Sequence, residues 1–263
     1  SSSSAASDVY KRQLLLRGYG HEALMAHWLI LAAIEQTLQT HRSRRWALWL
    51  GIAILTHAYL AVMVAAFWFA SFAHALIQRS PGLAKLLIGS LLLWGGLIAL
   101  AWLAGYVVPG SSQLVAQGYG HYSANLLTYF DPMDWQAFLN TFQRSDPNAA
   151  EWSRLLPPQG HAHYDQYEGF AYLGAGGILA LGAALALLPF RHRTTEDNAP
   201  RPQFAPALLM AAALFILGQS TTVTLGKHVL FSYSFPAPLQ HLLEIFRASG
   251  RFAWPLYYLI LIL

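Results

Sequence analysis

The chain has 263 residues, of which 56% are hydrophobic, 14% are aromatic and only 11% are charged. About a quarter of the residues in a soluble domain are charged, so this composition excludes that class, together with disordered, collagenous and coiled-coil chains. The remaining class is a multi-pass membrane protein, in which the placement of charges says more than their net value of +4. There is no cysteine, which excludes disulfide bonds, a thiol nucleophile and cysteine-ligated metals.

Both ends of the chain are unusual. Residues 1–13 read SSSSAASDVYKRQ, a polar and then basic stretch with no apolar run behind it, so they are not a signal peptide. They resemble a translated sequencing adaptor, and we leave them out of the fold. At the other end, residues 254–263 form an apolar run that is too short to cross a bilayer. We therefore expect an internal fragment of a longer protein, with spans missing on both sides.

Apolar stretches predict an all-α fold, a multi-pass transmembrane helical bundle. They cover roughly residues 23–34, 46–77, 86–108, 171–190 and 205–217. An N-terminal transmembrane part, residues 14–108, and a C-terminal part, residues 170–263, flank residues 109–169. This intervening segment is rich in acidic residues, and we expect it to form one folded loop outside the membrane.

The stretch 46–77 is too long for one upright span. As one helix it would measure roughly 48 Å, against a hydrocarbon core of about 30 Å. It is either one long tilted helix or a hairpin of two short helices. Only a hairpin that turns near Thr56-His57-Ala58 leaves the basic clusters at 42–45, 79–85 and 191–201 inside and the segment 109–169 outside. We therefore predict a half-span hairpin near residues 46–78, with a cavity that opens to the outside and has His57 at its floor.

Three residues are candidates for binding a lipid phosphate. His57 lies in an otherwise apolar run, where an imidazole costs free energy unless it is paired or wet, so it is either functional or hydrogen-bonded to a neighbouring helix. Arg247 and Arg251 are four residues apart and would share one face of a helix. Two guanidinium groups on one face suit a phosphate or pyrophosphate. The alternative is interfacial snorkelling beside an aromatic belt.

The outer loop has the composition of a sugar-binding surface. Residues 118–132, GYGHYSANLLTYFDP, mix aromatic rings with amide, hydroxyl and carboxylate groups. Tyr122, Asn125, Asp131 and Glu168 are the candidate contacts to a sugar or acceptor, although an ordinary folded loop would use the same residues. Glu168 is also expected at the N-terminal end of the following helix, where it would stabilise the helix dipole.

Other ligands have weaker support. His161, His163 and Asp165 have a metal-like spacing, but a metal site needs further ligands that the sequence does not supply. No cofactor is evident, and a bound divalent cation stays open. The basic residues are scattered through short loops, which favours membrane topology as their role and argues against nucleic acid.

Five short motifs, in order, resemble one family. They are HWLIL at 27–31, LTHAYL at 55–60, YSANLL at 122–127, YEGFAYLG at 167–174 and FRASGRF at 246–252. This pattern resembles a family of bacterial multi-pass membrane proteins of unknown function that is similar to the GT-C class of membrane glycosyltransferases. The resemblance runs from about Gly18 to the end of the chain.

The resemblance implies a function at the outer face of the bacterial inner membrane. GT-C enzymes transfer a sugar from a polyprenyl-phosphate carrier to an acceptor, and their catalytic carboxylate usually lies in the first outer loop. That region would lie upstream of this chain, so we expect this chain to be inactive alone. His57, Arg247 and Arg251 would hold the lipid phosphate, and residues 109–169 would cover the sugar or the acceptor. The alternatives are a transporter or flippase of polar lipids and a non-catalytic membrane scaffold.

Overall fold

The computed structural model describes residues 21–80, 82–106, 118–134, 153, 155–187 and 204–262. Most of these residues are helical, as the sequence predicts. The chain divides into two compact units, which are described separately. Unit 1 comprises residues 1–117, 203–214 and 244–246, and unit 2 comprises residues 118–202, 215–243 and 247–263.

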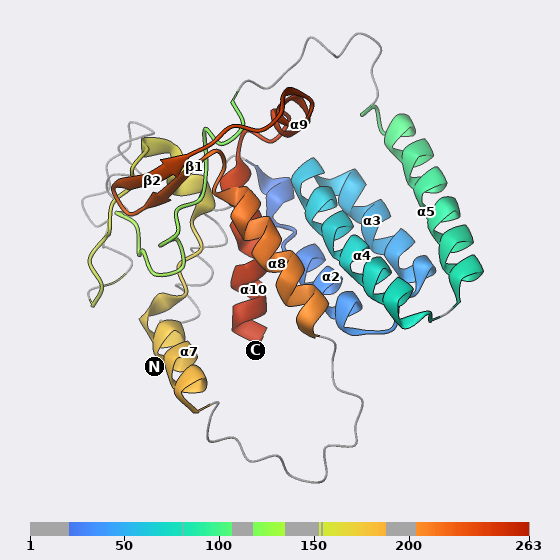
Figure 1. Ribbon diagram of the computed structural model, residues 1–263, viewed down its shortest axis with the longest axis horizontal. Helices are drawn as coiled ribbons and strands as arrows, with labels where there is room; N and C mark the ends of the chain where they lie inside the picture. Colours follow the sequence, from blue (N-terminus) through green and yellow to red (C-terminus); the bar gives the residue numbers. More distant parts are fainter. Residues whose placement is uncertain are drawn as a thin grey trace. The chain divides into compact units, whose positions relative to one another are not determined.

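Unit 1 is a bundle of apolar helices. A 3-10 helix, η1 (Glu22–Met25), leads into α2 (Trp28–Leu38), α3 (Ser43–Thr56), α4 (Ala58–Gln78) and α5 (Leu83–Leu103). Helix α4 packs against α2 and α3, and α5 packs against α3 (Figure 1). The core consists of fully buried side chains from three helices: Leu29, Ile30 and Ile34 of α2, Trp46 and Leu50 of α3, and Leu60, Met63 and Phe67 of α4.

The helical path breaks at His57. Its backbone is extended, with φ −166° and ψ 137°, and it ends α3 and begins α4. The amide of Tyr59 donates to the His57 Nδ1 atom at 3.2 Å, which satisfies one of the amides that the first turn of a helix leaves without a backbone acceptor. The imidazole therefore caps α4, and the turn lies within the predicted Thr56-His57-Ala58 stretch.

The two helices of this hairpin differ in length, which corrects the expectation of two half-spans. Helix α3 has 14 residues, whereas α4 has 21 residues and measures about 31 Å, the length of a complete span. The helices are joined at His57 and pack against each other, so Arg42, before α3, and Arg79, after α4, lie at their far ends. The basic groups thus gather away from His57, although the membrane side on which they lie stays a prediction.

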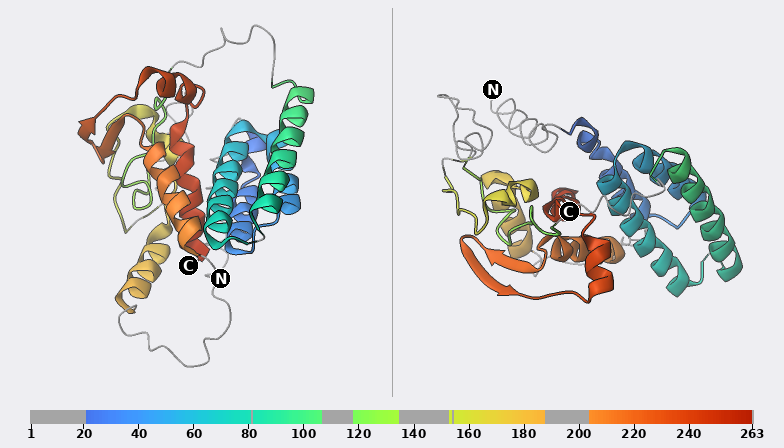
Figure 2. Two further views of the ribbon diagram at one scale, coloured as in Figure 1. Left: turned by 45° about the vertical axis from the view of Figure 1, so that its right-hand side comes forward. Right: turned by 90° about the horizontal axis from the view of Figure 1, so that it is seen from above.

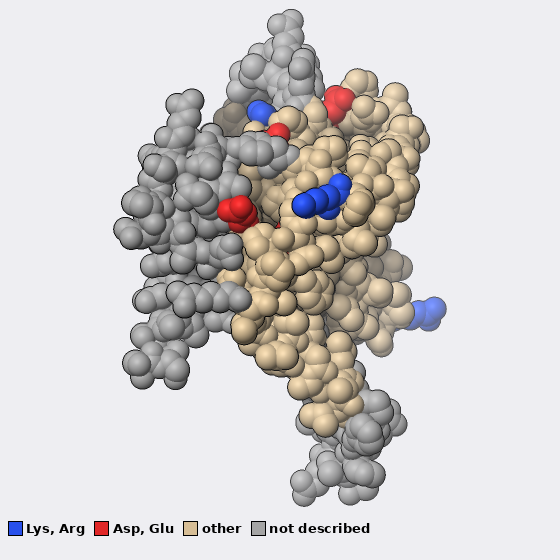
Figure 3. All heavy atoms as spheres, turned by 90° about the vertical axis from the view of Figure 1, so that its left-hand side faces the viewer, with Lys and Arg blue, Asp and Glu red and all other residues tan. Residues whose placement is uncertain are grey.

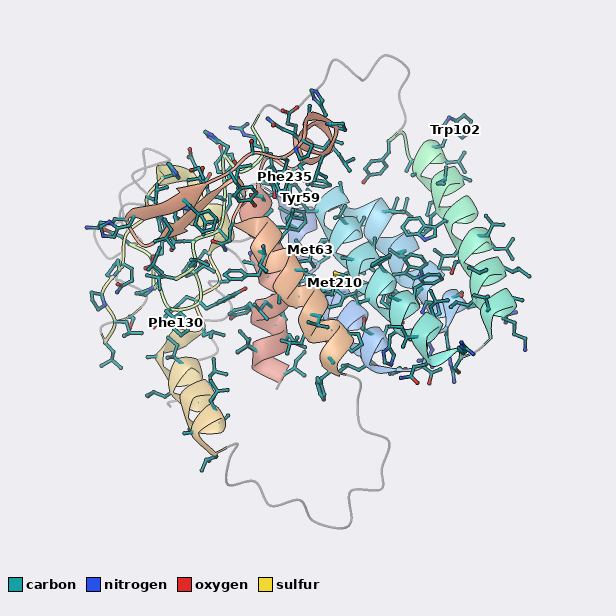
Figure 4. All side chains as sticks on the ribbon, in the orientation of Figure 1. Tyr59, Met63, Trp102, Phe130, Met210 and Phe235 are labelled. Carbon is teal, nitrogen blue, oxygen red and sulfur yellow. The ribbon has the colours of Figure 1, made fainter. Side chains whose placement is uncertain are left out.

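Two helices of the described chain are long and apolar enough to cross a membrane, α4 and α5. This is weak support for a membrane protein, and the full multi-pass bundle stays a prediction. Helix α5 has an apolar face that no described residue covers, formed by Leu87, Ile88, Leu91, Leu92, Ile98, Trp102 and Leu103, each about half exposed or more. Trp102 lies near the end of this helix (Figure 4). A lipid-facing helix would show this pattern.

Unit 2 is less regular and contains the one sheet in the described residues, which corrects the all-α expectation. It comprises η3 (Tyr164–Gly169), α7 (Gly174–Leu187), the end of α8 (Phe204–Gly218), strands β1 (Thr222–Leu225) and β2 (His228–Ser232), α9 (Ala237–Leu243), η5 (Ser249–Ala253) and α10 (Trp254–Ile262). Strands β1 and β2 are antiparallel, with Val223 opposite Phe231, and lead into α9 (Figure 2). The β-branched residues of TVTL and the turn at Gly226, where φ is +56°, favour this hairpin.

Aromatic residues hold unit 2 together. The Tyr129 hydroxyl donates to the Ala253 carbonyl at 2.8 Å, where η5 meets α10, and the Leu173 amide donates to the Tyr129 carbonyl at 3.0 Å. Phe252 and Trp254 are fully buried. These contacts tie the loop before Met133 to the start of α7 and to α10.

Part of the sequence interpretation falls outside the described residues. This applies to the adaptor-like residues 1–13, to residues 109–117 and 135–152 of the outer loop, and to the basic cluster at 191–201. Of the loop 109–169, the structure describes residues 118–134, 153 and 155–169.

Candidate functional site

Three segments of unit 2 cross at backbone contact distance. The Gly250 amide donates to the Tyr122 carbonyl at 2.7 Å, and the Tyr122 amide donates to the Arg247 carbonyl at 3.3 Å. A Cβ atom on Gly250 would lie 2.8 Å from the Gly169 amide nitrogen and from the Tyr122 carbonyl oxygen. Only glycine fits at position 250. The crossing brings together the side chains of the residues that flank Tyr122, Gly169 and Gly250 in the sequence.

Arg251 and Glu168 form a buried ion pair at this crossing. The Arg251 Nε and Nη2 atoms donate to the two carboxylate oxygens of Glu168, both at 2.9 Å. The Arg251 side chain is 6% exposed and the Glu168 side chain is 16% exposed. This bidentate geometry uses the fork of the guanidinium group and neutralises its charge. Two of the Arg251 nitrogen atoms therefore already donate to a carboxylate within the protein, and we assign the pair a structural role.

Two expectations about these residues are wrong. Arg247 lies in a turn before η5 and Arg251 lies within η5, so they do not share one face of an α-helix. The backbone around Gly250 bonds to Tyr122, which diverts it from an α-helical path. Glu168 does not begin the following helix either, because it lies in η3 and α7 starts only at Gly174. Its partner is a guanidinium group from a distant part of the chain.

Arg247 is the exposed member of the two arginines. Its guanidinium carbon lies 4.9 Å from the centre of the Tyr122 ring, and its Nη2 atom donates to the Tyr122 hydroxyl at 3.0 Å. A cation held over an aromatic face keeps its charge and loses little side-chain freedom when it binds an anion. Tyr122 thus orients Arg247, and both belong to the predicted site.

A second, partly exposed pair lies beside Tyr122. The His121 Nε2 atom is 2.9 Å from the Asp165 Oδ2 atom, and their side chains are 49% and 28% exposed. The His121 ring meets the Tyr122 ring edge-on at 4.8 Å. Sequence reasoning missed His121, although the glycines of Gly118-Tyr-Gly-His121, which permit a tight turn, are a signal that could have found it. We call His121, Tyr122, Asp165 and Arg247 the open cluster.

Tyr167 borders the open cluster. Its ring lies 5.7 Å from that of Tyr122 in a T-shaped contact. Burial raises the pKa of the Tyr167 hydroxyl well above its usual value, and the negative charge of the neighbouring Glu168 raises it further. The hydroxyl therefore stays protonated at physiological pH and remains a hydrogen-bond donor.

Asn125 belongs to a closed hydrogen-bond network. Its Nδ2 atom donates to Gln166, Thr224 and the Gly226 carbonyl, and its Oδ1 atom accepts from the Leu127 and Gly226 amides, all within 3.2 Å. The side chain has no bonding capacity left for a sugar. We call Asn125, Gln166, Thr224 and Gly226 the buried network, and we assign Asn125 a structural role in place of the predicted sugar contact.

Asp131 is also structural. The Asp131 residue is 3% exposed, and its Oδ1 atom accepts from the amides of Met133 and Gln159 at 3.0 and 3.1 Å. Its Oδ2 atom lies 3.3 Å from His161 Nε2. The carboxylate thus holds two parts of the outer loop together, and it is the partner that the structure gives to one histidine of the metal-like spacing. Within the residues that the structure describes, no group of three metal-ligating side chains occurs.

His57 belongs to unit 1, whereas Arg247 and Arg251 belong to unit 2. Within unit 1, the His57 ring lies 5.7 Å from that of Tyr59, which in turn meets the ring of Phe246 at 5.6 Å. Tyr59 is labelled near the start of α4 in Figure 4. A shared lipid-phosphate site for His57 and the arginines stays a prediction.

These features define a mostly helical protein with two helices that could cross a membrane and an open cluster of charged and aromatic side chains. The face in Figure 3 carries a few cations and anions among uncharged side chains. The chain matches the model of the domain of unknown function DUF6311 over residues 9–263, so it belongs to that family. The match includes residues 9–13, which the sequence analysis left out of the fold. Neither a curated protein nor a solved structure matches the chain.

Proposed function

We propose that this protein is a membrane glycosyltransferase that uses a polyprenyl-phosphate-linked sugar at the outer face of the membrane. Arg247 carries the proposal. Its guanidinium group is exposed, stacked on Tyr122 and hydrogen-bonded to the Tyr122 hydroxyl, so a positive charge is held ready for an anion. Such a group suits the phosphate of a lipid carrier, whose negative charge increases as the glycosidic bond breaks.

The two arginines have different roles in this proposal. Arg251 pairs with Glu168, fixes η5 against η3 and thereby positions the backbone that carries Arg247. Arg247 is four residues away and contacts the phosphate. His57 belongs to unit 1, so its place in a phosphate site stays an expectation from the sequence.

The surfaces of the helices support a membrane location for this chemistry. Helix α5 exposes the apolar face described above, and the described side chains of α7 include none that is buried. Leu179, Leu185 and Leu187 of α7 are each more than half exposed. Apolar surface of this extent favours a lipid environment, in which a lipid-linked donor is the available substrate.

Release of the lipid carrier tests the proposal without knowledge of the acceptor. The full-length protein is reconstituted in nanodiscs with polyprenyl-phosphate-linked glucose, and free polyprenyl phosphate is measured. We expect release by the wild type and at least a tenfold loss with Arg247→Gln, because a charge-assisted contact is worth about 1.5–3 kcal/mol. The matched control is Lys227→Gln, which removes an exposed cation from the β1–β2 turn of the same unit.

The outcome also separates an enzyme from a transporter or flippase. A transporter would move the intact lipid-linked sugar between leaflets and would release no free polyprenyl phosphate. No release by the wild type, or full release by Arg247→Gln, would overturn the proposal.

A further inference from the structure

We infer that His121 and Asp165 form a general-base dyad that deprotonates the sugar acceptor. The inference rests on the proposed sugar transfer, and it replaces the upstream carboxylate that the GT-C resemblance implies. Its basis is one juxtaposition: an exposed imidazole, oriented by a carboxylate, lies on the same tyrosine ring as the exposed guanidinium group of Arg247.

The His121–Asp165 contact fixes the roles of the two ring nitrogens. The Nε2 atom lies 2.9 Å from Asp165 Oδ2, and a carboxylate accepts a hydrogen bond, so Nε2 carries the proton of the neutral ring. The Nδ1 atom is then the basic nitrogen. In the part of the chain that the structure describes, Nδ1 has no hydrogen-bond partner, and the side chain is 49% exposed. A substrate hydroxyl can therefore reach it.

The backbone around His121 is unusual in a way that positions the ring. Gly118 and Gly120 adopt φ values of +97° and +83°, and the His121 amide donates to the Gly118 carbonyl at 3.0 Å. A Cβ atom on Gly120 would collide with Ser220 Oγ, which leaves room only for glycine there. The hydroxyl of Tyr119 donates to the Leu217 carbonyl at 2.6 Å and anchors the turn to the end of α8.

Tyr122 connects the base to the phosphate site. The centre of its ring lies 4.8 Å from the centre of the His121 ring and 4.9 Å from the guanidinium carbon of Arg247. One lipid-linked sugar bound beside Tyr122 could therefore present its phosphate to Arg247 and its anomeric carbon to an acceptor held by His121.

The proposed step is balanced without a further reagent. The His121 Nδ1 atom takes the proton of the acceptor hydroxyl, and the acceptor oxygen forms a bond to the anomeric carbon. The bond between that carbon and the phosphate oxygen breaks, and its electron pair leaves with the phosphate, where Arg247 stabilises the added charge. Asp165 stabilises the imidazolium that forms. The proton returns to solvent from His121 after the product leaves.

The second histidine–aspartate pair of unit 2 provides a matched control. His161 Nε2 lies 3.3 Å from Asp131 Oδ2, but the Asp131 side chain is 4% exposed and already accepts two backbone amides. The pair has the same composition as the dyad and a structural role. Because two backbone amides hold Asp131 in place without His161, His161→Gln should leave turnover unchanged.

The experiment measures turnover and binding separately. Release of polyprenyl phosphate from polyprenyl-phosphate-linked glucose is followed in nanodiscs, with water or an added sugar as acceptor, and binding of polyprenyl phosphate itself is measured in parallel. We expect His121→Gln to lower turnover at least a hundredfold, the usual scale of general-base catalysis, and to leave binding unchanged. Asp165→Asn, which removes the positioning charge, should lower turnover by a smaller factor. Added imidazole should partly restore turnover to His121→Gly, which a purely structural role would not allow.

The outcomes separate this inference from the proposed function. If the wild type turns over and Arg247→Gln does not, while His121→Gln keeps full turnover, the dyad is overturned and the proposed function stands. If the wild type releases no polyprenyl phosphate, the function and the dyad both fall. A loss of turnover in His161→Gln equal to that in His121→Gln would also overturn the dyad, because it would trace the effect to disturbance of the loop.

Discussion

The open cluster and the buried network use neighbouring residues of the same two segments, yet they differ in exposure and in hydrogen bonding. Tyr122 and Asp165 of the open cluster lie close in the sequence to Asn125 and Gln166 of the buried network. Asn125 and Gln166 are 3% and 2% exposed, and Asn125 is fully hydrogen-bonded within the protein, whereas His121 of the open cluster is about half exposed. The difference teaches that residue type does not identify a binding site in this loop. The two groups are distinguished by exposure and by unused hydrogen-bonding capacity.

The largest expected effect concerns the buried ion pair. Arg251→Met leaves Glu168 buried without its partner, and we expect a loss of about 3–5 kcal/mol in the free energy of unfolding. The measurement is chemical unfolding in detergent. The double variant with Glu168→Met should recover much of the loss, because two apolar side chains tolerate this environment. Equal stability of Arg251→Met and wild type would show that the pair is solvated and that Arg251 belongs with the open residues.

Next in size is the buried network. Asn125→Ala removes one side chain that bonds five groups, and each polar group left unsatisfied costs about 1–3 kcal/mol. We expect a loss of at least about 2 kcal/mol of unfolding free energy, measured by the same unfolding experiment. Sugar binding that weakens without any change in stability would place Asn125 back among the ligand contacts.

Gly250 tests the backbone crossing at which the segments of Tyr122, Gly169 and Gly250 meet. A Cβ atom there would lie 2.8 Å from the backbone atoms of Gly169 and Tyr122, so Gly250→Ala should cost about 1–3 kcal/mol through forced backbone movement. Gly95→Ala is the control, because a Cβ atom at that position of α5 meets nothing within 4 Å. The control should be neutral or slightly stabilising in thermal unfolding. Similar losses in both variants would mean that the close approach is not what Gly250 is needed for.

Histidines extend the comparison to pH. Burial lowers the pKa of His41 below its ordinary value of 6.5, and its Nδ1 atom lies 2.9 Å from the hydroxyl of Ser71. The folded state therefore binds fewer protons than the unfolded state below pH 6.5, so stability should be complete above that pH and should decrease as the pH falls towards the folded pKa. We expect His41→Gln to have a flatter stability profile over this window than the wild type. A wild-type profile as flat as that of the variant would contradict a buried, neutral His41.

The smallest effect on stability is expected within the open cluster. Tyr122→Phe removes one hydroxyl that accepts from the exposed Arg247, and surface changes of this kind usually alter stability by less than about 0.5 kcal/mol. Binding of polyprenyl phosphate should weaken nonetheless, because Arg247 loses its orienting partner. Thermal unfolding and lipid binding measured on one preparation separate the two effects. A large loss of stability would show that the Tyr122 hydroxyl has a structural role, like the residues of the buried network.

Much of the fold followed from composition and local pattern. The apolar stretches correspond to α2, α3 with α4, α5, α7 and α8, because a long apolar run satisfies its backbone polar groups most easily as a helix. The interruption at His57 could be placed because a polar residue within an apolar run, together with the charges on either side, left few other turning points. The hairpin of β1 and β2 was missed, because its strands have only four and five residues and every residue of β2 is exposed, which leaves no alternating pattern.

The sequence by itself determined a helical, apolar, cysteine-free protein of the DUF6311 family and the residue types from which a site could be built. It did not determine which of these side chains already have hydrogen-bond or ion-pair partners within the folded protein. Arg247 and Arg251 look equivalent in FRASGRF, and only the tertiary structure gives one a buried carboxylate and the other a tyrosine face. The reason is physical. Helix formation depends on neighbours in the chain, whereas the state of a charged or hydrogen-bonding group depends on partners here 83 to 125 positions away.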